Sequence, residues 1–173
     1  MEEIRKHGLA PLVGTSPKIL ILGSLPSDES IARQKYYGNP RNLFWKVMAG
    51  VFGDSVPASY QEKKAFIFRH GVALWDVFGS AEREGSLDAN IREISCNDIA
   101  GFLSEHPTIK VIGLNGGKAT KAFQRIMKKD PGAFGEVKVF PLTSTSALSV
   151  SAGWPLERIT QQWKHLITAY EDI

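Results

Sequence analysis

Residues 36–45 combine side chains that suit the handling of a flat, polar ring. They read Tyr-Tyr-Gly-Asn-Pro-Arg-Asn-Leu-Phe-Trp and so place four aromatic residues, two asparagines and one arginine around a proline. An aromatic face can stack on such a ring, and a carboxamide can bond to the ring's edge or hold a water molecule. Both abilities are useful to a protein that handles a nucleobase removed from its stack.

Four short apolar segments are typical of strands that are buried on both faces: residues 18–23, 71–76, 109–115 and 137–141. Segments with helical periodicity lie between and after them, at residues 42–53, 60–70, 97–106, 117–129 and 155–170. Strands that alternate with helices of this length indicate βαβ units. We therefore expect an α/β fold in which a parallel sheet carries helices on both faces.

Polar residues follow each of these expected strands. They occur in residues 24–30, at Asp76, at Asn115 and in residues 143–146. The carboxyl ends of parallel strands meet at one edge of a sheet, and ligand sites in such folds lie beyond that edge. We therefore expect a functional site there, built from residues that are far apart in the sequence.

Residues 23–27, Gly-Ser-Leu-Pro-Ser, allow two interpretations. Gly23 permits a close backbone approach, and the amides that follow it, together with Ser24 and Ser27, can hold an anion or the edge of a base. The same residues can also form an ordinary turn between a strand and a helix. They are not a P-loop, because the GxxxxGK[ST] spacing is absent.

Two further strand ends carry groups that suit a ligand. Residues 115–120 predict a strand end that leads into a helix, where backbone amides and Lys118 can bind a phosphate. A glycine turn beside a solvated lysine is the alternative. Asp76 ends an apolar strand, so we expect it to be half-buried and to find partners or shift its pKa. It can cap the next turn or accept hydrogen bonds from a substrate ring.

Residues 142–149 are rich in hydroxyl groups. Ser144, Thr145 and Ser146 can bond to phosphate oxygens, and Leu148 can press into a base stack as an apolar wedge. An ordinary Ser/Thr-rich surface loop is the alternative. Residues 83–88 read as a polar loop in which Arg83 is solvated or reaches a phosphate.

The composition sets broad limits. A length of 173 residues suits one domain, residues 1–173, and a net charge of +3 permits nucleic-acid binding without demonstrating it. The single cysteine, Cys96, excludes an internal disulfide and is expected at a helix start or in the core. The four histidines lack metal-ligand spacing, and no apolar run is long enough to span a membrane. We expect a cytoplasmic protein with no bound metal.

The order of these segments resembles that of the DNA-deoxyinosine (hypoxanthine-DNA) glycosylases, a branch of the uracil-DNA glycosylase superfamily. The similar segments are residues 23–27, 34–45, 71–77, 82–88, 115–119 and 144–146. The resemblance implies a three-layer αβα sandwich around a four-stranded parallel sheet. It also implies a monofunctional enzyme without metal or cofactor. Such an enzyme flips a deaminated base out of DNA and hydrolyses its N-glycosidic bond, which leaves an abasic site.

The resemblance also implies roles for individual residues. Asn42 is similar to the family's catalytic asparagine, which orients water or stabilises the leaving group. Asp76 lies where relatives carry a carboxamide that reads the base. Phe44 is expected to stack on the extruded ring, beside Gly23, Ser24 and Asn115. The expected DNA contacts are Ser27, Arg41, Lys118, Ser144, Thr145, Ser146 and Leu148.

Two places depart from the family pattern. Many superfamily members carry an acidic or amide catalytic residue where this chain has Leu25, so the task of activating water shifts to Asn42 or Asp76. The branch also tends to have prolines around its Ser-Thr-Ser loop, where this chain has Thr143 and Ala147.

The expected partner is double- or single-stranded DNA that contains hypoxanthine or uracil, and the protein is expected to act as a monomer. Both bases present an N–H beside a carbonyl, so the sequence does not separate them. One alternative is an N-glycosidase of small nucleosides or nucleotides, which should lack a basic rim and a wedge. Another is a non-catalytic nucleic-acid binding domain of the same fold, which should bind DNA without cleaving it.

Overall fold

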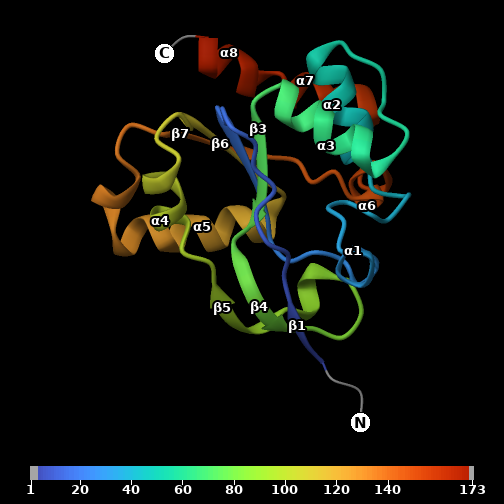
Figure 1. Ribbon diagram of the computed structural model, residues 1–173. Coiled ribbons are helices and arrows are strands. Elements are labelled where there is room, and N and C mark those ends of the chain that lie inside the picture. Colours follow the sequence, from blue (N-terminus) through green and yellow to red (C-terminus); the bar gives the residue numbers. More distant parts are fainter. Residues whose placement is uncertain (1–3, 172–173) are drawn as a thin grey trace.

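A four-stranded parallel sheet forms the centre of the computed structural model, which describes residues 4–171 (Figure 1). Every neighbouring pair of strands in it is parallel. In spatial order the strands are β3 (Val72–Asp76), β2 (Ile19–Gly23), β6 (Val111–Asn115) and β7 (Lys138–Leu142). The four strands predicted from the apolar segments are confirmed, and so is the α/β class.

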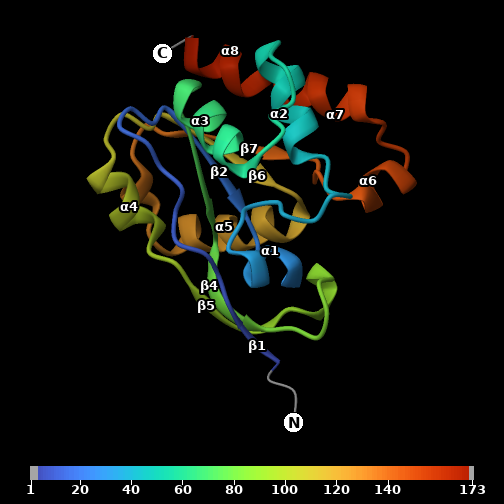
Figure 2. The same cartoon turned by 45° about the vertical axis from the view of Figure 1, so that its right-hand side comes forward.

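Helices cover both faces of this sheet, as Figures 1 and 2 show from two directions. One face is covered by α4 (Ile99–Glu105) and α5 (Gly117–Lys129). The other face is covered by α2 (Phe44–Phe52), α3 (Tyr60–Arg69), α7 (Leu156–Trp163) and α8 (His165–Glu171). The three-layer αβα sandwich is therefore confirmed.

Alternation along the central strand β2 divides the core into two parts. Ile19 and Ile21 pack with residues of α2, α3 and α7, whereas Leu20 and Leu22 pack with residues of α4 and α5. All four side chains are buried. Successive side chains of a strand point to opposite faces, so a strand covered on both sides must be apolar at every position.

Three short helical features were not predicted in this form. The expected helix at residues 155–170 is divided into α7 and α8. Helix α1 (Asp28–Arg33) follows β2 directly, and the Ser27 side chain caps it by accepting from the backbone N–H of Ser30. Helix α6 (Ala147–Ser151) begins within the Ser/Thr-rich segment, where Ser146 accepts from the N–H of Leu148.

A second, antiparallel sheet was also missed. It contains β1 (Arg5–His7), β4 (Phe78–Glu82) and β5 (Arg92–Cys96), in the order β1-β4-β5. β1 has only three residues, β4 is partly polar and every residue of β5 is exposed, so these strands lack the apolar pattern that marks the central sheet. Cys96 lies in β5 and is exposed, so the expectation of a helix start or a core position for it was wrong.

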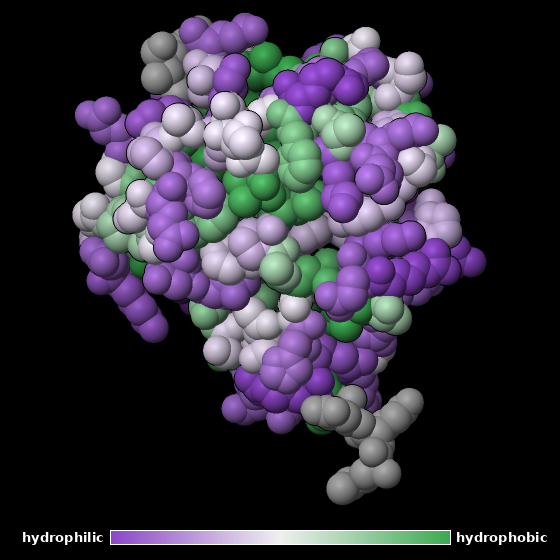
Figure 3. Space-filling view, in the orientation of Figure 1, coloured by the Kyte–Doolittle hydropathy of each residue, from purple (hydrophilic) through white to green (hydrophobic). Residues whose placement is uncertain are grey.

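The surface mixes polar and apolar side chains. In the space-filling view, hydrophilic side chains cover much of the face shown and a group of apolar side chains lies near its middle (Figure 3). No helix within residues 4–171 is long and apolar enough to cross a membrane.

Candidate active site

A cavity of about 550 Å³ lies beyond the carboxyl ends of β2, β3 and β6. A volume of this size lies in the range of small-molecule sites. The cavity is lined by residues 23–27, 86–88 and 144–149, together with Ser30, Tyr36, Tyr37, Asn39, Arg41, Asn42, Asp76 and Asn115. The structure thus brings together every residue predicted for the site apart from Phe44 and Lys118.

Phe44 is the clearest correction to the predicted site. Its side chain has no exposed area, and it packs between Tyr37 and the aromatic rings of Trp45 and Trp163. The rings of Tyr37 and Phe44 are stacked, with centroids 3.9 Å apart. Tyr37 lines the cavity and Phe44 does not. The structure therefore contradicts the expected position of Phe44 at the cavity, and the Tyr37 ring that covers Phe44 lines the cavity in its place.

Tyr37 is held in an uncommon backbone conformation. Its φ is 51°, in the left-handed region that residues other than glycine seldom adopt. The chain on either side is fixed: the N–H of Tyr36 donates to the hydroxyl of Tyr60, and the N–H of Gly38 donates to Oγ of Ser30. Burial, and secondarily the charge of Asp76, raise the pKa of the Tyr37 hydroxyl. Tyr37 is thus a neutral ring in a fixed position.

The amide of Asn42 has a defined orientation. Its Oδ1 accepts from the backbone N–H of Phe44 at 3.0 Å and from Oγ1 of Thr145 at 2.8 Å. A backbone N–H can only donate, so the atom that faces it must be the oxygen. Nδ2 donates to no group within residues 4–171 and is the part of the amide left for the cavity. Asn42 therefore presents hydrogen-bond donors there.

Asn115 continues these hydrogen bonds into a chain in which the donor and the acceptor of each bond are fixed. Its Oδ1 accepts from the N–H of Thr145, and its Nδ2 donates to Oγ1 of Thr145 and to the hydroxyl of Tyr37. Thr145 must then donate its own proton to Asn42. The Tyr37 oxygen accepts from Asn115, so its proton remains for a group in the cavity. Asn115 and Thr145 are buried and act through their neighbours.

Asp76 lies at the end of β3 as a buried carboxyl group, only 5% exposed. Its Oδ2 is buried without a hydrogen-bond partner among the residues described. Burial, and secondarily the nearby charge of Asp88, raise the pKa of Asp76 to about 7, although Arg83 opposes the shift. Near neutral pH this group is therefore divided between its acid and carboxylate forms.

Gly23 allows Asp76 to approach the end of β2. A β-carbon at position 23 would lie 2.5 Å from Oδ1 of Asp76 and 3.5 Å from the hydroxyl of Tyr37. The first distance is far below van der Waals contact, so any side chain here would displace the carboxyl group. The bare backbone at Gly23 keeps the Asp76 carboxyl beside the phenol of Tyr37.

Sequence reasoning missed a second carboxylate in the cavity. Asp88 lies at the start of the 3-10 helix η1 (Asp88–Asn90), and its Oδ1 accepts from Oγ of Ser24 at 2.8 Å. Burial of the carboxyl against the cavity wall raises its pKa, although Ser24, Arg83 and Lys118 oppose the shift. The polar character of residues 83–88 was visible in the sequence, but nothing in the sequence indicated that Asp88 contacts the end of β2.

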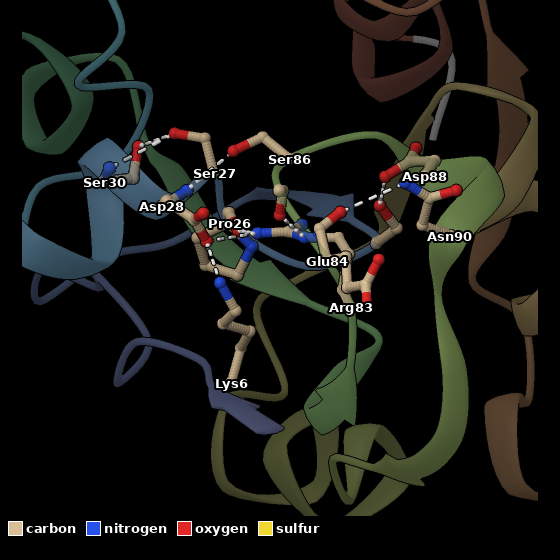
Figure 4. A network of polar contacts seen from close by, with 12 residues as sticks. Lys6, Pro26, Ser27, Asp28, Ser30, Arg83, Glu84, Ser86, Asp88 and Asn90 are labelled. Carbon is tan, nitrogen blue, oxygen red and sulfur yellow. Dashed lines mark hydrogen bonds and ion pairs between the residues drawn. The ribbon is translucent and has the colours of Figure 1, made fainter. Parts of the chain in front are cut away.

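Arg83 also differs from expectation. It was predicted to be solvated or to reach a phosphate, yet its side chain has no exposed area. Its guanidinium donates to the carbonyl oxygens of Gly85 and Pro26 and lies 3.3 Å from the carboxylate of Asp28 (Figure 4). Arg83 therefore joins the chain after β2 to the loop after β4.

Lys118 lies in the first turn of α5 and does not line the cavity. Together with Lys121, Arg125 and Lys129 it lines a second, smaller pocket beside β5. The spacing of these four cations places them along one side of α5. The positive charge of Lys118 opposes the rise in the pKa of Asp88, so this basic side begins near the cavity.

Leu148 projects from α6 at the rim of the cavity. Its side chain is 63% exposed, and Val150 on the same helix is also exposed. Ser144, Ser146 and Ser149 lie in the same part of the cavity wall. The rim thus combines hydroxyl groups with the exposed apolar side chain of Leu148. Within the described part of the chain, no three His, Cys, Asp or Glu residues are grouped so that they could hold a metal ion.

Comparison with known proteins identifies the family of this chain. Residues 10–167 match the Uracil DNA glycosylase superfamily. The chain belongs to this superfamily. A protein of Methanosarcina acetivorans named hypoxanthine DNA glycosylase is 39% identical over 140 residues, which cover 80% of this chain and 86% of the relative. A protein of Methanosarcina barkeri with the same name is 35% identical over 117 residues, which cover 67% and 74%.

A solved structure supports the same membership. The solution NMR structure of a candidate uracil DNA glycosylase from Methanosarcina acetivorans superimposes with a TM-score of 0.80 at 31% sequence identity. The match covers 96% of this chain and 99% of that one. The resemblance inferred from the order of the sequence segments is confirmed.

Proposed function

We propose that this protein is a DNA glycosylase that excises hypoxanthine, and also uracil, from DNA by hydrolysis of the N-glycosidic bond. The cavity at the strand ends carries the proposal, because it joins an accessible aromatic ring to hydrogen-bond donors and an unpartnered carboxyl group. The two Methanosarcina relatives named hypoxanthine DNA glycosylase support hypoxanthine as the main substrate.

The groups in the cavity suit the edge of a deaminated base. Hypoxanthine offers N1–H beside the O6 carbonyl, and uracil offers N3–H between two carbonyls. In its carboxylate form Asp76 can accept the ring N–H, and the Nδ2 group of Asn42 can donate to a carbonyl. Adenine and cytosine carry an amino group where these bases carry the carbonyl. The amino group would then face a hydrogen-bond donor of the protein, and neither group would have an acceptor.

Asn42 is placed to assist departure of the base. Cleavage leaves the bonding electron pair on the base and positive charge on the sugar, and preorganised donors stabilise the developing negative charge. The Nδ2 group of Asn42 is such a donor, since both acceptor positions of its Oδ1 are already occupied by Phe44 and Thr145. In this proposal Asn42 stabilises the leaving base.

The rim of the cavity favours DNA over a free nucleoside. Leu148 is exposed beside the cavity, where an apolar side chain can fill the space left in a duplex by a flipped base. Ser27, Arg41, Ser144 and Ser146 surround the same opening and can bond to phosphate oxygens. The basic side of α5 that begins at Lys118 would add phosphate contacts beyond the lesion. We propose that one copy of the chain is sufficient for this engagement.

Cleavage of defined oligonucleotides tests the proposal. The protein is incubated with duplex and single-stranded oligonucleotides that carry one deoxyinosine, deoxyuridine or deoxyxanthosine, and abasic sites are then converted to strand breaks with alkali. We expect breaks at deoxyinosine and at deoxyuridine, and none in the matched undamaged strand. Asn42→Ala protein, purified in the same way, controls for contaminating glycosylases. Absence of breaks at all three lesions would exclude the proposed activity, and binding without breaks would favour the non-catalytic alternative.

A further inference from the structure

The attacking water loses a proton when a glycosidic bond is hydrolysed, and a base in the cavity accelerates this step by accepting that proton. Few groups in the cavity can do so. Asn42 is excluded, because both acceptor positions of its oxygen are occupied. The Tyr37 phenol stays protonated because burial raises its pKa. No histidine among residues 4–171 lines the cavity, and its serine hydroxyls are poor bases. Two carboxyl groups remain, Asp76 and Asp88.

These two carboxyl groups have different surroundings. Asp76 lies deep at the strand end, with Oδ2 sealed from solvent and Oδ1 pressed against Gly23. Asp88 lies at the cavity wall, and the residue as a whole is exposed. Ser24 bonds to its Oδ1, while Oδ2 accepts from no group among the described residues. Asp76 is therefore placed to meet the edge of a buried ring, and Asp88 can meet water that enters from the mouth of the cavity.

The loop that carries Asp88 is firmly held. Asn90 donates through Nδ2 to the carbonyl of Glu84, and the backbone N–H of Asp28 donates to Oγ of Ser86 (Figure 4). Ile91, directly after η1, is buried in the core. A catalytic group needs a fixed position relative to the bond it acts on, and these contacts supply one.

Arg83 holds this loop in place through hydrogen bonds to two backbone carbonyl groups. Its Nε donates to Gly85 at 2.7 Å and its Nη2 donates to Pro26 at 2.6 Å. Asp28 lies within reach of both Arg83 and Lys6, and although partial burial opposes it, these two cations hold the pKa of Asp28 below its usual range. Figure 4 shows Lys6 and Arg83 approaching Asp28. Arg83 is thus a positioning residue that ties the loop of Asp88 to the segment of Ser24.

We propose that Asp88 is the catalytic carboxylate that activates the attacking water, held toward the cavity by Ser24 and by the loop anchored on Arg83. In this step the water oxygen forms a bond to C1′ of the sugar as the bond from C1′ to the base nitrogen breaks. The electron pair of that bond leaves with the base, and the water proton passes to Asp88 and then to solvent. The base takes its own proton from solvent. The inference rests on the glycosylase function proposed above.

Two substitutions at Asp88 and one at Ser24 test this role. The single-turnover rate on a duplex with one deoxyinosine, the affinity for that duplex and the melting temperature are measured for D88N, D88A, S24A and the unchanged protein. We expect D88N and D88A to lower the rate at least about 100-fold, the lower range for a general base, with affinity and melting temperature retained. S24A keeps the carboxylate and should lose much less rate. Added formate should restore part of the D88A rate, because it can occupy the vacated place.

Each outcome decides the role of Asp88. A D88N rate close to that of the unchanged protein overturns the proposal. So does a loss of rate that S24A reproduces in full or that is matched by loss of affinity or melting temperature, because Asp88 would then serve to hold the loop. Failure of the glycosylase function itself is recognised separately, since the unchanged protein would then leave every lesion intact.

Discussion

The ring of Tyr37 lies flat against the ring of Phe44, with the two centroids 3.9 Å apart and the ring planes 16° apart. Phe44 is buried from its other sides by Trp45 and Trp163. A base that enters the cavity would thus add a layer to an existing aromatic stack. Tyr37 would contact the base, and Phe44 would hold Tyr37 in place.

Replacement of Tyr37 should weaken capture of the base. Tyr37→Ala is expected to reduce affinity for a duplex with one deoxyinosine by roughly 1–3 kcal/mol, which is what stacking contributes for each base. Tyr37→Phe keeps the ring and the left-handed backbone position and is the matched control, with most of the affinity retained. Fluorescence anisotropy with labelled duplexes measures both. Equal affinity of the alanine and unchanged proteins would contradict the stacking role.

Asn42 should matter to turnover more than to folding. Asn42→Ala removes the donor that faces the leaving base, and we expect the single-turnover rate to fall roughly 100- to 1,000-fold. Asn42→Asp supplies oxygens in place of the Nδ2 donor and should lose a similar amount. Asn39→Ala is the neighbouring control, because within residues 4–171 the Asn39 side chain accepts only from the N–H of Arg41. An Asn39 variant that loses as much rate as Asn42→Ala would remove the special role of Asn42.

Asp76 should make the protein less stable as pH rises. Its pKa is about 7 in the folded protein against an ordinary value of 3.8. Between these values the folded state holds a proton that the unfolded chain releases, so the free energy of unfolding falls as pH increases from about 4 to about 7. Asp76→Asn should remove this loss and stabilise the protein at pH 8 by at most about 4 kcal/mol.

Urea unfolding of both proteins at several pH values measures this effect. The difference in stability between Asp76→Asn and the unchanged protein should disappear below about pH 4, where the carboxyl is neutral in both states. Parallel curves for the two proteins across this range would show that Asp76 does not have a raised pKa.

Leu148 should be needed on duplex DNA in particular. A flipped base leaves a space in a duplex that an apolar side chain can fill, whereas a single strand has no such space. Leu148→Ala is therefore expected to slow excision from duplex DNA while excision from a single strand is nearly unchanged. Val150→Ala, on the same short helix, is the matched control. Equal losses on both kinds of DNA would argue against a wedge.

Much of the fold followed from local sequence patterns. The strands of the central sheet are continuous apolar runs because helices cover both faces, and such runs are easily recognised. The strands β1, β4 and β5 lack that pattern, and β1 pairs with β4 across a long stretch of sequence, as in Arg5 with Glu82. Half-polar strands of this kind have no distinctive local signal.

The site was predicted in outline but not in its details. The rule that parallel strands end at one edge correctly brought Asp76 and Asn115 together with the segment after β2. The stacking role of Phe44 came from the family resemblance, which did not show that the ring of Tyr37 covers Phe44 in this chain. Asp88 was missed because its contact with Ser24 joins two loops 64 positions apart. Such contacts depend on the complete fold.

The direction of the hydrogen bonds around the cavity is set by the main chain. The backbone N–H groups of Phe44 and Thr145 orient the amides of Asn42 and Asn115, and those amides then decide which protons reach the cavity. No substitution other than proline can remove a backbone N–H. The donor pattern that faces the substrate is therefore buffered against mutation at Phe44, and a change of substrate class would require new amides or carboxyls in place of Asn42 or Asp76.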